Sequence, residues 1–265
     1  MIKIFFLILF FSMNSSSSES FPELYGCFCE GGIITGQLVN KGNITINNKK
    51  IETFENGRFI YAFGRKSKNI IKLEINGEIR EFEIKKKKYK VENIKGLPTN
   101  KVEPSKNEIE RILFDKKQIT KAKEIGSTKK LFGKKFIMPS KGRLSGVYGS
   151  QRILNSKPRR PHAGIDIAAN EGTKIISPAA GIIKLVSNNM FFTGNTIIID
   201  HGLGLISIFA HLKEITVNEG ESVKQGDKIG TIGMTGRATG PHVHWGVYLE
   251  KISVDPLSLI KFEMN

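Results

Sequence analysis

Between residues 31 and 89 the apolar positions form short runs separated by turn residues, a pattern typical of β-strands joined by tight loops. Asn56-Gly57 and Asn76-Gly77 are dipeptides that two-residue hairpin loops favour. Three apolar residues before the second dipeptide alternate with polar ones and should share one face: Ile71, Leu73 and Ile75. The pattern predicts a small β domain over residues 30–95, with a structural role or a role in docking to a partner.

The pattern becomes helical over residues 104–126. Ser105 and Glu108 have the spacing of a capping box, and Gly126 is a typical stop signal. The apolar residues between them recur at near-helical spacing: Ile109, Ile112, Leu113, Ile119, Ala122 and Ile125. We expect an amphipathic linker helix that packs on a neighbouring domain.

A second β-rich region, residues 135–262, contains every histidine of the chain. This clustering is the first indication that the C-terminal half carries the function. In the stretch "HAGIDIAA" the alternation is that of a strand, and His162 and Asp166 fall on one face of it. The residues beside them on that face are small, which leaves room for a bound group. A helix is a poorer fit, because Gly164 would lie inside it.

The stretch "TGPHVHWGV" repeats the strand alternation. His242 and His244 would lie side by side on the polar face, while the apolar face packs into the core: Val243, Trp245 and Val247. The stretch "LISIFAHL" predicts another strand, which ends at His211. The remaining histidine, His201, follows an apolar run and is expected to be a turn residue with local hydrogen bonds.

Five side chains are therefore candidates for a metal site: His162, Asp166, His211, His242 and His244. A catalytic zinc ion typically has three histidine or carboxylate ligands and one water, and mixed nitrogen and oxygen ligands suit zinc better than magnesium or calcium. The surplus over three ligands indicates a hydrolase, which needs an open position and groups that move protons. A His-x-His pair alone is more often an exposed pair than a ligand pair, so the hypothesis rests on the combination.

The N-terminus and the cysteines bear on location. Residues 1–20 combine one lysine, a short apolar run and a serine-rich stretch, which predicts a signal peptide and export to the periplasm or cell envelope. A disulfide between Cys27 and Cys29 would be strained if both residues lay on an extended strand, so the role of the two cysteines is left open. Lipid attachment at Cys27 is an alternative role. The net charge of +16 fits either attraction to an anionic polymer or a general lysine-rich composition.

Three stretches, "HAGIDIAA", "GNTIIIDHGLGLISIFAHL" and "GMTGRATGPHVHWGV", resemble the LytM/lysostaphin-type zinc endopeptidases of bacterial cell walls. The resemblance covers about residues 140–255 and implies a C-terminal antiparallel β-sheet or sandwich peptidase domain. It further implies that Zn²⁺ is held by His162, Asp166 and His244, and that His211 and His242 are catalytic. Where this family often has tyrosine, the chain has Phe209, which would pack inward or line the groove.

The resulting hypothesis is a secreted zinc endopeptidase that hydrolyses peptide cross-links of peptidoglycan, in a groove between the loops near residues 155–160, 188–194 and 234–240. The basic loop "KPRRP" next to His162 could contact carboxylates of the wall peptide. The alternative is a catalytically silent wall-binding regulator that activates a murein amidase. No nucleic-acid ligand is expected, and association with the inner membrane or the cell-division machinery, like the oligomeric state, is left open.

Overall fold

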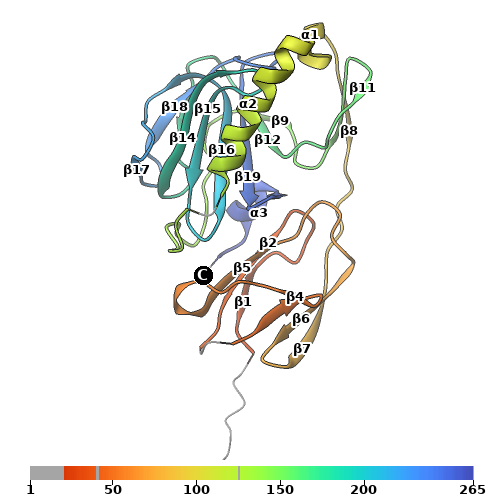
Figure 1. The fold of residues 1–265 in the computed structure, drawn as a ribbon, viewed down its shortest axis with the longest axis vertical. Helices are drawn as coiled ribbons and strands as arrows, with labels where there is room; N and C mark the ends of the chain where they lie inside the picture. The colour runs from red at the N-terminus through yellow and green to blue at the C-terminus, as the bar shows by residue number, and fades with distance from the viewer. Residues whose placement is uncertain (1–20, 40–41, 125, 265) are drawn as a thin grey trace, which may run out of the picture.

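The computed structural model describes residues 21–39, 42–124 and 126–264, and antiparallel sheets predominate in this part of the chain, which confirms the mainly β fold class. Two units follow one another along the chain and lie at opposite ends of the elongated molecule (Figure 1). The predicted signal peptide lies outside the described residues. Within the described ranges no helix has the length and apolar character that a membrane crossing requires.

The N-terminal unit consists of two small sheets, ordered β1-β2-β5 and β4-β3-β6-β7. Its strands are β1 (Leu24–Gly26), β2 (Ile33–Gln37), β3 (Ile44–Ile46), β4 (Lys49–Lys50), β5 (Arg58–Ala62), β6 (Ile70–Ile75) and β7 (Glu78–Glu83). Side chains from both sheets form one core, in which Ile34, Phe59 and Leu73 are almost fully buried. The apolar residues that alternate along these strands are thus the ones that face this shared core.

The two predicted hairpin loops have different outcomes. Asn76 and Gly77 join β6 to β7 with φ angles of 50° and 88°, and Ile75 pairs with Glu78, so this hairpin is confirmed. The hairpin predicted at Asn56-Gly57 is wrong. That dipeptide lies in the 3-10 turn η1 (Glu55–Gly57), and the strands around it pair elsewhere, β4 with β3 and β5 with β2.

The structure joins Cys27 and Cys29 in a disulfide, which the sequence analysis expected to be strained. The expectation assumed an extended strand, whereas β1 ends at Gly26 and the chain then turns, with the amide of Gly32 donating to the carbonyl of Cys29. The Cα atoms of the two cysteines therefore lie only 5.3 Å apart, within the range that a disulfide spans.

Along the chain, two helices follow the N-terminal unit: α1 (Thr99–Val102) and α2 (Lys106–Ala122). Ser105 is the N-cap of α2, and both bonds of its predicted capping box with Glu108 are present. The helix crosses the face of the C-terminal sheet over β14, β15 and β16 (Figure 1). Ile119 and Ala122 pack there against side chains of the sheet, so the helix covers one end of this face.

The C-terminal unit is built on a ten-stranded sheet whose main order is β17-β14-β15-β16-β19-β12-β9. Its elements are β9 (Arg143–Gly146), β12 (Gly164–Ala168), β13 (Lys174–Ile176), β14 (Gly181–Met190), β15 (Gly194–Asp200), β16 (Leu205–Ile215), β17 (Ser222–Val223), β18 (Lys228–Ile232), β19 (His242–Leu249), β20 (Ile252–Val254) and the helix α3 (Pro256–Lys261). One face of the central strands forms the main core, where Phe209 stacks on Trp245. Phe209 thus packs inward rather than lining a groove.

The chain between the units is part of the C-terminal architecture. Strand β8 (Val91–Ile94) pairs in parallel with β10 (Gln151–Leu154), which also pairs with β11 (Lys157–Pro158). The units touch directly as well, since Lys87 forms an ion pair with Asp255 at 2.5 Å. Three apolar side chains of β2 and β5 belong to the main core of the C-terminal unit: Ile33, Ile60 and Ala62.

His201 follows β15 in the turn before β16 and is fully buried. Its Nδ1–H donates to the carbonyl of Ala180 at 2.8 Å, and its Nε2 accepts from the hydroxyl of Ser207 at 2.9 Å. The same hydroxyl oxygen accepts from Trp245 Nε1 at 3.1 Å. This network suits a neutral imidazole, and burial lowers the pKa of His201 to about 4.

This buried histidine makes a testable contribution to the pH dependence of stability. Its pKa is lower in the folded chain than the usual 6.5, so the unfolded chain binds the extra proton, and stability from this group is lost as the pH falls from about 6.5 towards 4. The loss amounts to about 3 kcal/mol. The variant His201→Asn should be less stable than the parent at pH 7, and the difference should shrink towards pH 4. Urea unfolding of both chains with a metal chelator measures this, and parallel pH profiles would contradict it.

Candidate metal centre and its cavity

Three side chains converge at the junction of β12 and β19. Asp166 lies in β12 and pairs with His244 of β19, so both side chains project from the same face of the sheet. His162 lies two residues before β12, and its amide donates to the carbonyl of Ser150. The strands hold their register because residues between these positions, such as Ile165 and Trp245, are buried on the opposite face.

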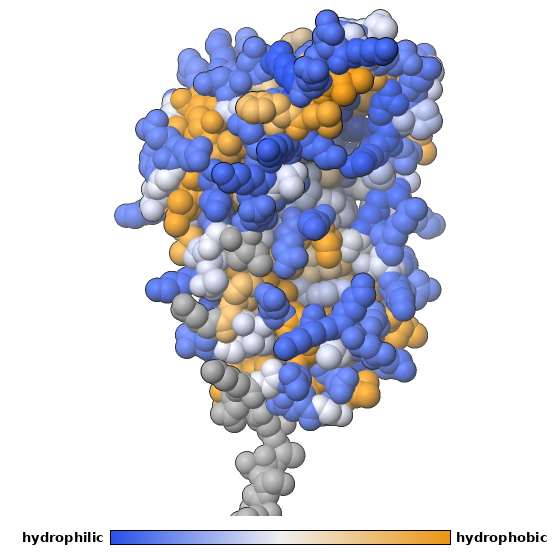
Figure 2. Space-filling view, viewed as in Figure 1, coloured by the Kyte–Doolittle hydropathy of each residue, from blue (hydrophilic) through white to orange (hydrophobic). Residues whose placement is uncertain are grey.

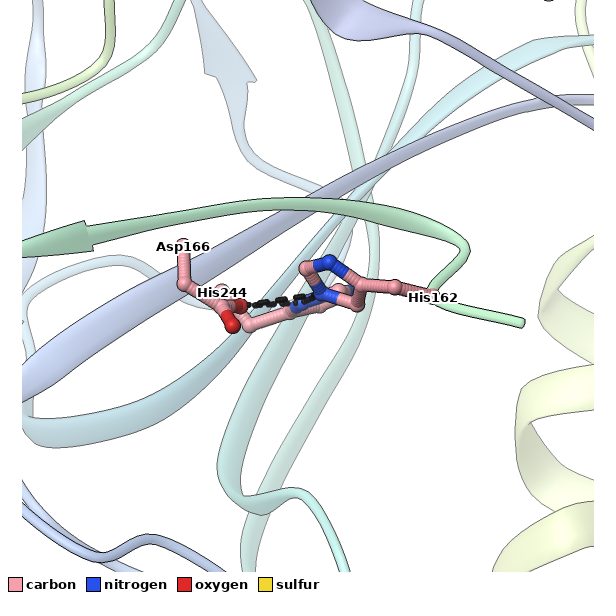
Figure 3. Close-up of side chains that lie close together, drawn as sticks. All are labelled: His162, Asp166 and His244. Atoms are coloured by element: carbon pink, nitrogen blue, oxygen red, sulfur yellow. Dashed lines mark hydrogen bonds and ion pairs between the residues drawn. The ribbon is translucent and has the colours of Figure 1, made fainter. Parts of the chain in front are cut away.

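The atoms that face one another are close enough to share a single ion. His162 Nε2 lies 2.9 Å from His244 Nδ1 and 3.1 Å from Asp166 Oδ1, and His244 Nδ1 lies 2.8 Å from the same oxygen. Figure 3 shows the two rings and the carboxylate turned toward one point. All three residues are mostly buried, so few waters compete for these atoms.

The protonation pattern indicates what the cluster lacks. His162 Nδ1–H donates to the carbonyl of Val147 at 3.0 Å, which leaves a lone pair on its Nε2 directed at the cluster. Burial lowers the pKa of His244 to about 4, so this ring is neutral as well. Burial alone would raise the pKa of Asp166, but the contacts of this carboxylate with the two histidine rings outweigh burial and hold the pKa well below its usual range. With the lone pair of His162 Nε2 facing the cluster, at most one proton, on His244 Nδ1, is shared by the three facing atoms, and a bound cation would satisfy all three.

The donor set therefore fits a metal ion. Two imidazole nitrogens and one carboxylate oxygen form a ligand set typical of an open, catalytic zinc site. Among the described residues, His162, Asp166 and His244 lie close enough together to provide such a set. The group consists of the three residues that the family resemblance implies as ligands, out of the five candidates that the sequence left open. Their role as ligands stays a prediction of the donor chemistry.

His211 reaches this site through a break in its strand. Ala210 pairs with His244 and shares its face, so regular alternation would direct the next side chain into the core. His211 instead has a φ of 68°, which is left-handed, and its ring centroid lies 4.7 Å from that of His242. Strand β16 does not end at His211, as the sequence predicted, but continues to Ile215 past an irregularity.

His211 and His242 present the same ring atom to the cavity. Each Nδ1–H donates to a main-chain carbonyl, of Thr235 at 2.7 Å for His211 and of Gly240 at 2.8 Å for His242. In the neutral rings, Nε2 then carries the free lone pair. Burial, followed by the nearby His242, lowers the pKa of His211 to about 3, so His211 stays neutral near pH 7.

Behind the cluster lies a residue that the sequence analysis missed. Arg152 of β10 donates to Asp166 Oδ2 and lies 3.4 Å from a carboxylate oxygen of Glu92. Gly146 makes room for this contact, since a Cβ there would lie 2.4 Å from Asp166 Oδ2. Neither residue has a local sequence signal, because β10 and β9 meet Asp166 only through tertiary packing.

The cluster opens into a cavity of about 900 Å³. The three predicted groove loops contribute to it through residues such as Arg159, Phe192 and Arg237. Another wall comes from the linker, from Glu92 to Val102, which the sequence analysis did not anticipate. In the view of Figure 2 hydrophilic side chains predominate around the upper part of the molecule, with separate apolar patches between them.

Comparisons with known proteins relate part of this chain to a peptidase family. Residues 160–256 match the model of peptidase family M23. A crystal structure assigned to peptidase M23 from Pseudomonas aeruginosa aligns over 88% of this chain and 94% of its own, with a TM-score of 0.62 and 29% identity. The likeness therefore includes the N-terminal unit.

Two curated relatives each match less than half of this chain. An uncharacterized metalloprotease of Buchnera aphidicola is 40% identical over 126 residues, which are 47% of this chain and 33% of the relative. The peptidoglycan DD-endopeptidase ShyA of Vibrio cholerae is 34% identical over 112 residues, 42% of this chain and 26% of its own. The chain thus spans a third or less of the length of these relatives.

The geometry predicts that the two histidines of β19 have different roles, with His244 binding zinc and His242 not binding it. His244→Ala removes one of three ligand atoms and should abolish stoichiometric zinc binding. His242→Ala leaves the ligand cluster intact and should keep one zinc per chain. Metal analysis of both purified variants decides the matter, and equal zinc contents would contradict this division of roles.

Gly146→Ala should weaken zinc binding without removing a ligand. The added Cβ would press on Asp166 and on Arg152 Nη2, 2.8 Å away, and displace the carboxylate from its orientation. Loss of such support typically costs about 10- to 100-fold in metal affinity. Competition with a chelating dye measures the affinity. Gly133→Ala is the matched control, since a Cβ there meets nothing within 4 Å, and an unchanged affinity in Gly146→Ala would refute the supporting role.

Proposed function

Because the chain carries a peptidase family M23 domain at residues 160–256, we propose that the protein is a zinc-dependent endopeptidase acting on the peptide cross-links of peptidoglycan. The observation that carries this proposal is the open cluster of His162, Asp166 and His244 beside two further histidines in one cavity. A relative named as a peptidoglycan DD-endopeptidase supports the choice of substrate, and of a D-alanyl cross-link as the bond.

His162, Asp166 and His244 would hold the zinc ion. When bound, zinc supplies a Lewis acid that polarises the scissile carbonyl and acidifies water. The chain's own contribution is to orient and deprotonate the attacking water. Nε2 of His211 accepts a hydrogen bond from that water, because this ring stays neutral.

His242 takes the proton at Nε2 and passes it to the leaving nitrogen. Its ring is less buried than that of His211. Its fixed Nδ1 bond to the carbonyl of Gly240 keeps Nε2 directed at the cavity in both protonation states. The protonated ring also stabilises negative charge on the former carbonyl oxygen.

The catalytically silent regulator is the less favoured alternative. A regulator needs neither an open metal cluster nor histidines with free Nε2 atoms, whereas this chain has both. Export to the cell envelope is part of the proposal. It is supported by the predicted signal peptide and by the Cys27–Cys29 disulfide, since disulfides persist in oxidising compartments.

Purified sacculi test the proposal. The zinc-loaded chain should release soluble muropeptides with newly freed D-alanine carboxyl ends, as mass spectrometry of the products would show. His242→Ala is the matched control, because it should bind zinc and yet lose on the order of 100-fold or more in rate. Intact cross-links after incubation with the zinc-loaded parent chain would overturn the proposal.

A further inference from the structure

The cavity beside the metal cluster has a large excess of positive charge. Its lining contains five arginines: Arg143, Arg152, Arg159, Arg160 and Arg237. Only two carboxylates line it, those of Glu92 and Asp166, and both lie against Arg152. The other four arginines have no acidic side chain within 4.0 Å among the residues that the structure describes.

Two of these arginines are held in place by uncharged groups. Arg159 donates through Nη2 to the carbonyl of Val102 at 2.7 Å, and Arg237 donates through Nη1 to the carbonyl of Lys101 at 3.3 Å. The guanidinium of Arg237 also lies 4.3 Å from the ring centroid of Phe192. Both side chains are thus oriented by α1 and the facing loop, and neither has its charge neutralised.

The environment of Arg237 is unfavourable for a cation. Burial, and next the charges of Arg152 and Arg159, lower its pKa to about 10. Partial desolvation next to two like charges costs free energy, which an anionic ligand would recover. The positions of these arginine side chains are therefore better explained by the binding of an anionic ligand than by a contribution to the stability of the fold.

The loop that carries Arg237 also holds a catalytic histidine. The amide of Arg237 donates to the carbonyl of Phe192 at 2.8 Å, and the carbonyl of Thr235, two residues earlier, accepts from His211 Nδ1. A ligand group on Arg237 is thereby fixed relative to the reacting bond, because one short segment positions both.

We propose that Arg159 and Arg237 form a carboxylate subsite, which selects cross-links bearing a free carboxylate on the residue that donates the scissile nitrogen. This inference rests on the proposed function and specifies its substrate. A guanidinium fork matches a carboxylate in geometry and charge. In a cross-link whose amide nitrogen comes from diaminopimelate, the carbon bonded to that nitrogen carries such a carboxylate. A glycine bridge, or a diaminopimelate amidated at this position, offers none.

Defined cross-linked muropeptide dimers test the subsite, one with this carboxylate free and one with it amidated. The zinc-loaded parent chain should have a kcat/KM on the order of 10- to 100-fold higher for the free acid, the range of a charged hydrogen bond. Arg237→Gln and Arg159→Gln should each remove most of this preference by slowing cleavage of the free acid while leaving the amidated dimer within about threefold. If the parent chain cleaves both dimers at equal rates, the subsite is overturned.

A matched control separates a specific subsite from general attraction. Arg160 lines the same cavity but is exposed, so Arg160→Gln should lower the rates for both dimers little and equally, and keep the preference. If Arg160→Gln and Arg237→Gln reduce the preference alike, the inference is wrong. Zinc content and thermal unfolding verify that each variant is folded.

A binding measurement keeps this inference distinguishable from the proposed function. Calorimetry with zinc-loaded His242→Ala, which should not cleave, should show at least about tenfold tighter binding of the free acid. The double variant His242→Ala/Arg237→Gln should lose that difference. If the parent chain cleaves neither dimer but the binding preference holds, the proposed function fails and the subsite stands. If cleavage occurs and binding shows no preference, the subsite fails and the proposed function stands.

Discussion

The site depends on one cross-strand pairing, that of Asp166 in β12 with His244 in β19. The pairing is not held mainly by the polar side chains themselves. It is held by the apolar residues that alternate with them, since a slip by one residue would bring Ile165 and Trp245 to the polar face. Exposure of each such side chain costs about 1.5–3 kcal/mol, more than a surface ion pair contributes. The hydrophobic core therefore determines the geometry of the metal cluster.

This dependence explains how much of the site the sequence could predict. Period-two alternation is a local property, so it placed His242 and His244 on one polar face and Asp166 on the polar face of a second strand. The same rule fails at His211, which alternation assigns to the face of Phe209. Only the left-handed backbone at His211 turns the ring toward the cavity, and a left-handed histidine has no signal in one sequence. The sequence analysis named His211 as a candidate because it ends an apolar run, and the family resemblance implies a catalytic role for it, but periodicity alone does not direct its ring to the cavity.

Other differences between the sequence analysis and the structure also arise where local patterns do not determine the fold. The Asn56-Gly57 dipeptide does form a tight turn, but the partners of β4 and β5 are set by packing in the N-terminal unit. Cys27 and Cys29 are joined because the chain has already left β1. Arg152 and Arg237 enter the cavity from segments 85 residues apart, and no local pattern relates them. The confirmed predictions rest on local sequence patterns. Apart from the Cys27–Cys29 disulfide, the features named here that the sequence analysis missed depend on contacts between distant segments.

The origin of one cavity wall has a wider consequence. Strand β8 and helix α1 are connecting segments, and they border the cavity without contributing a metal ligand. One wall of the cavity is thus encoded in a stretch of the chain that is separate from the clustered histidines and Asp166. Changes of length or composition between residues 91 and 103 would alter the shape of the cavity, while the sheet that fixes the cluster stays intact. Such a division lets the range of molecules that the cavity admits change without any change in the cluster itself.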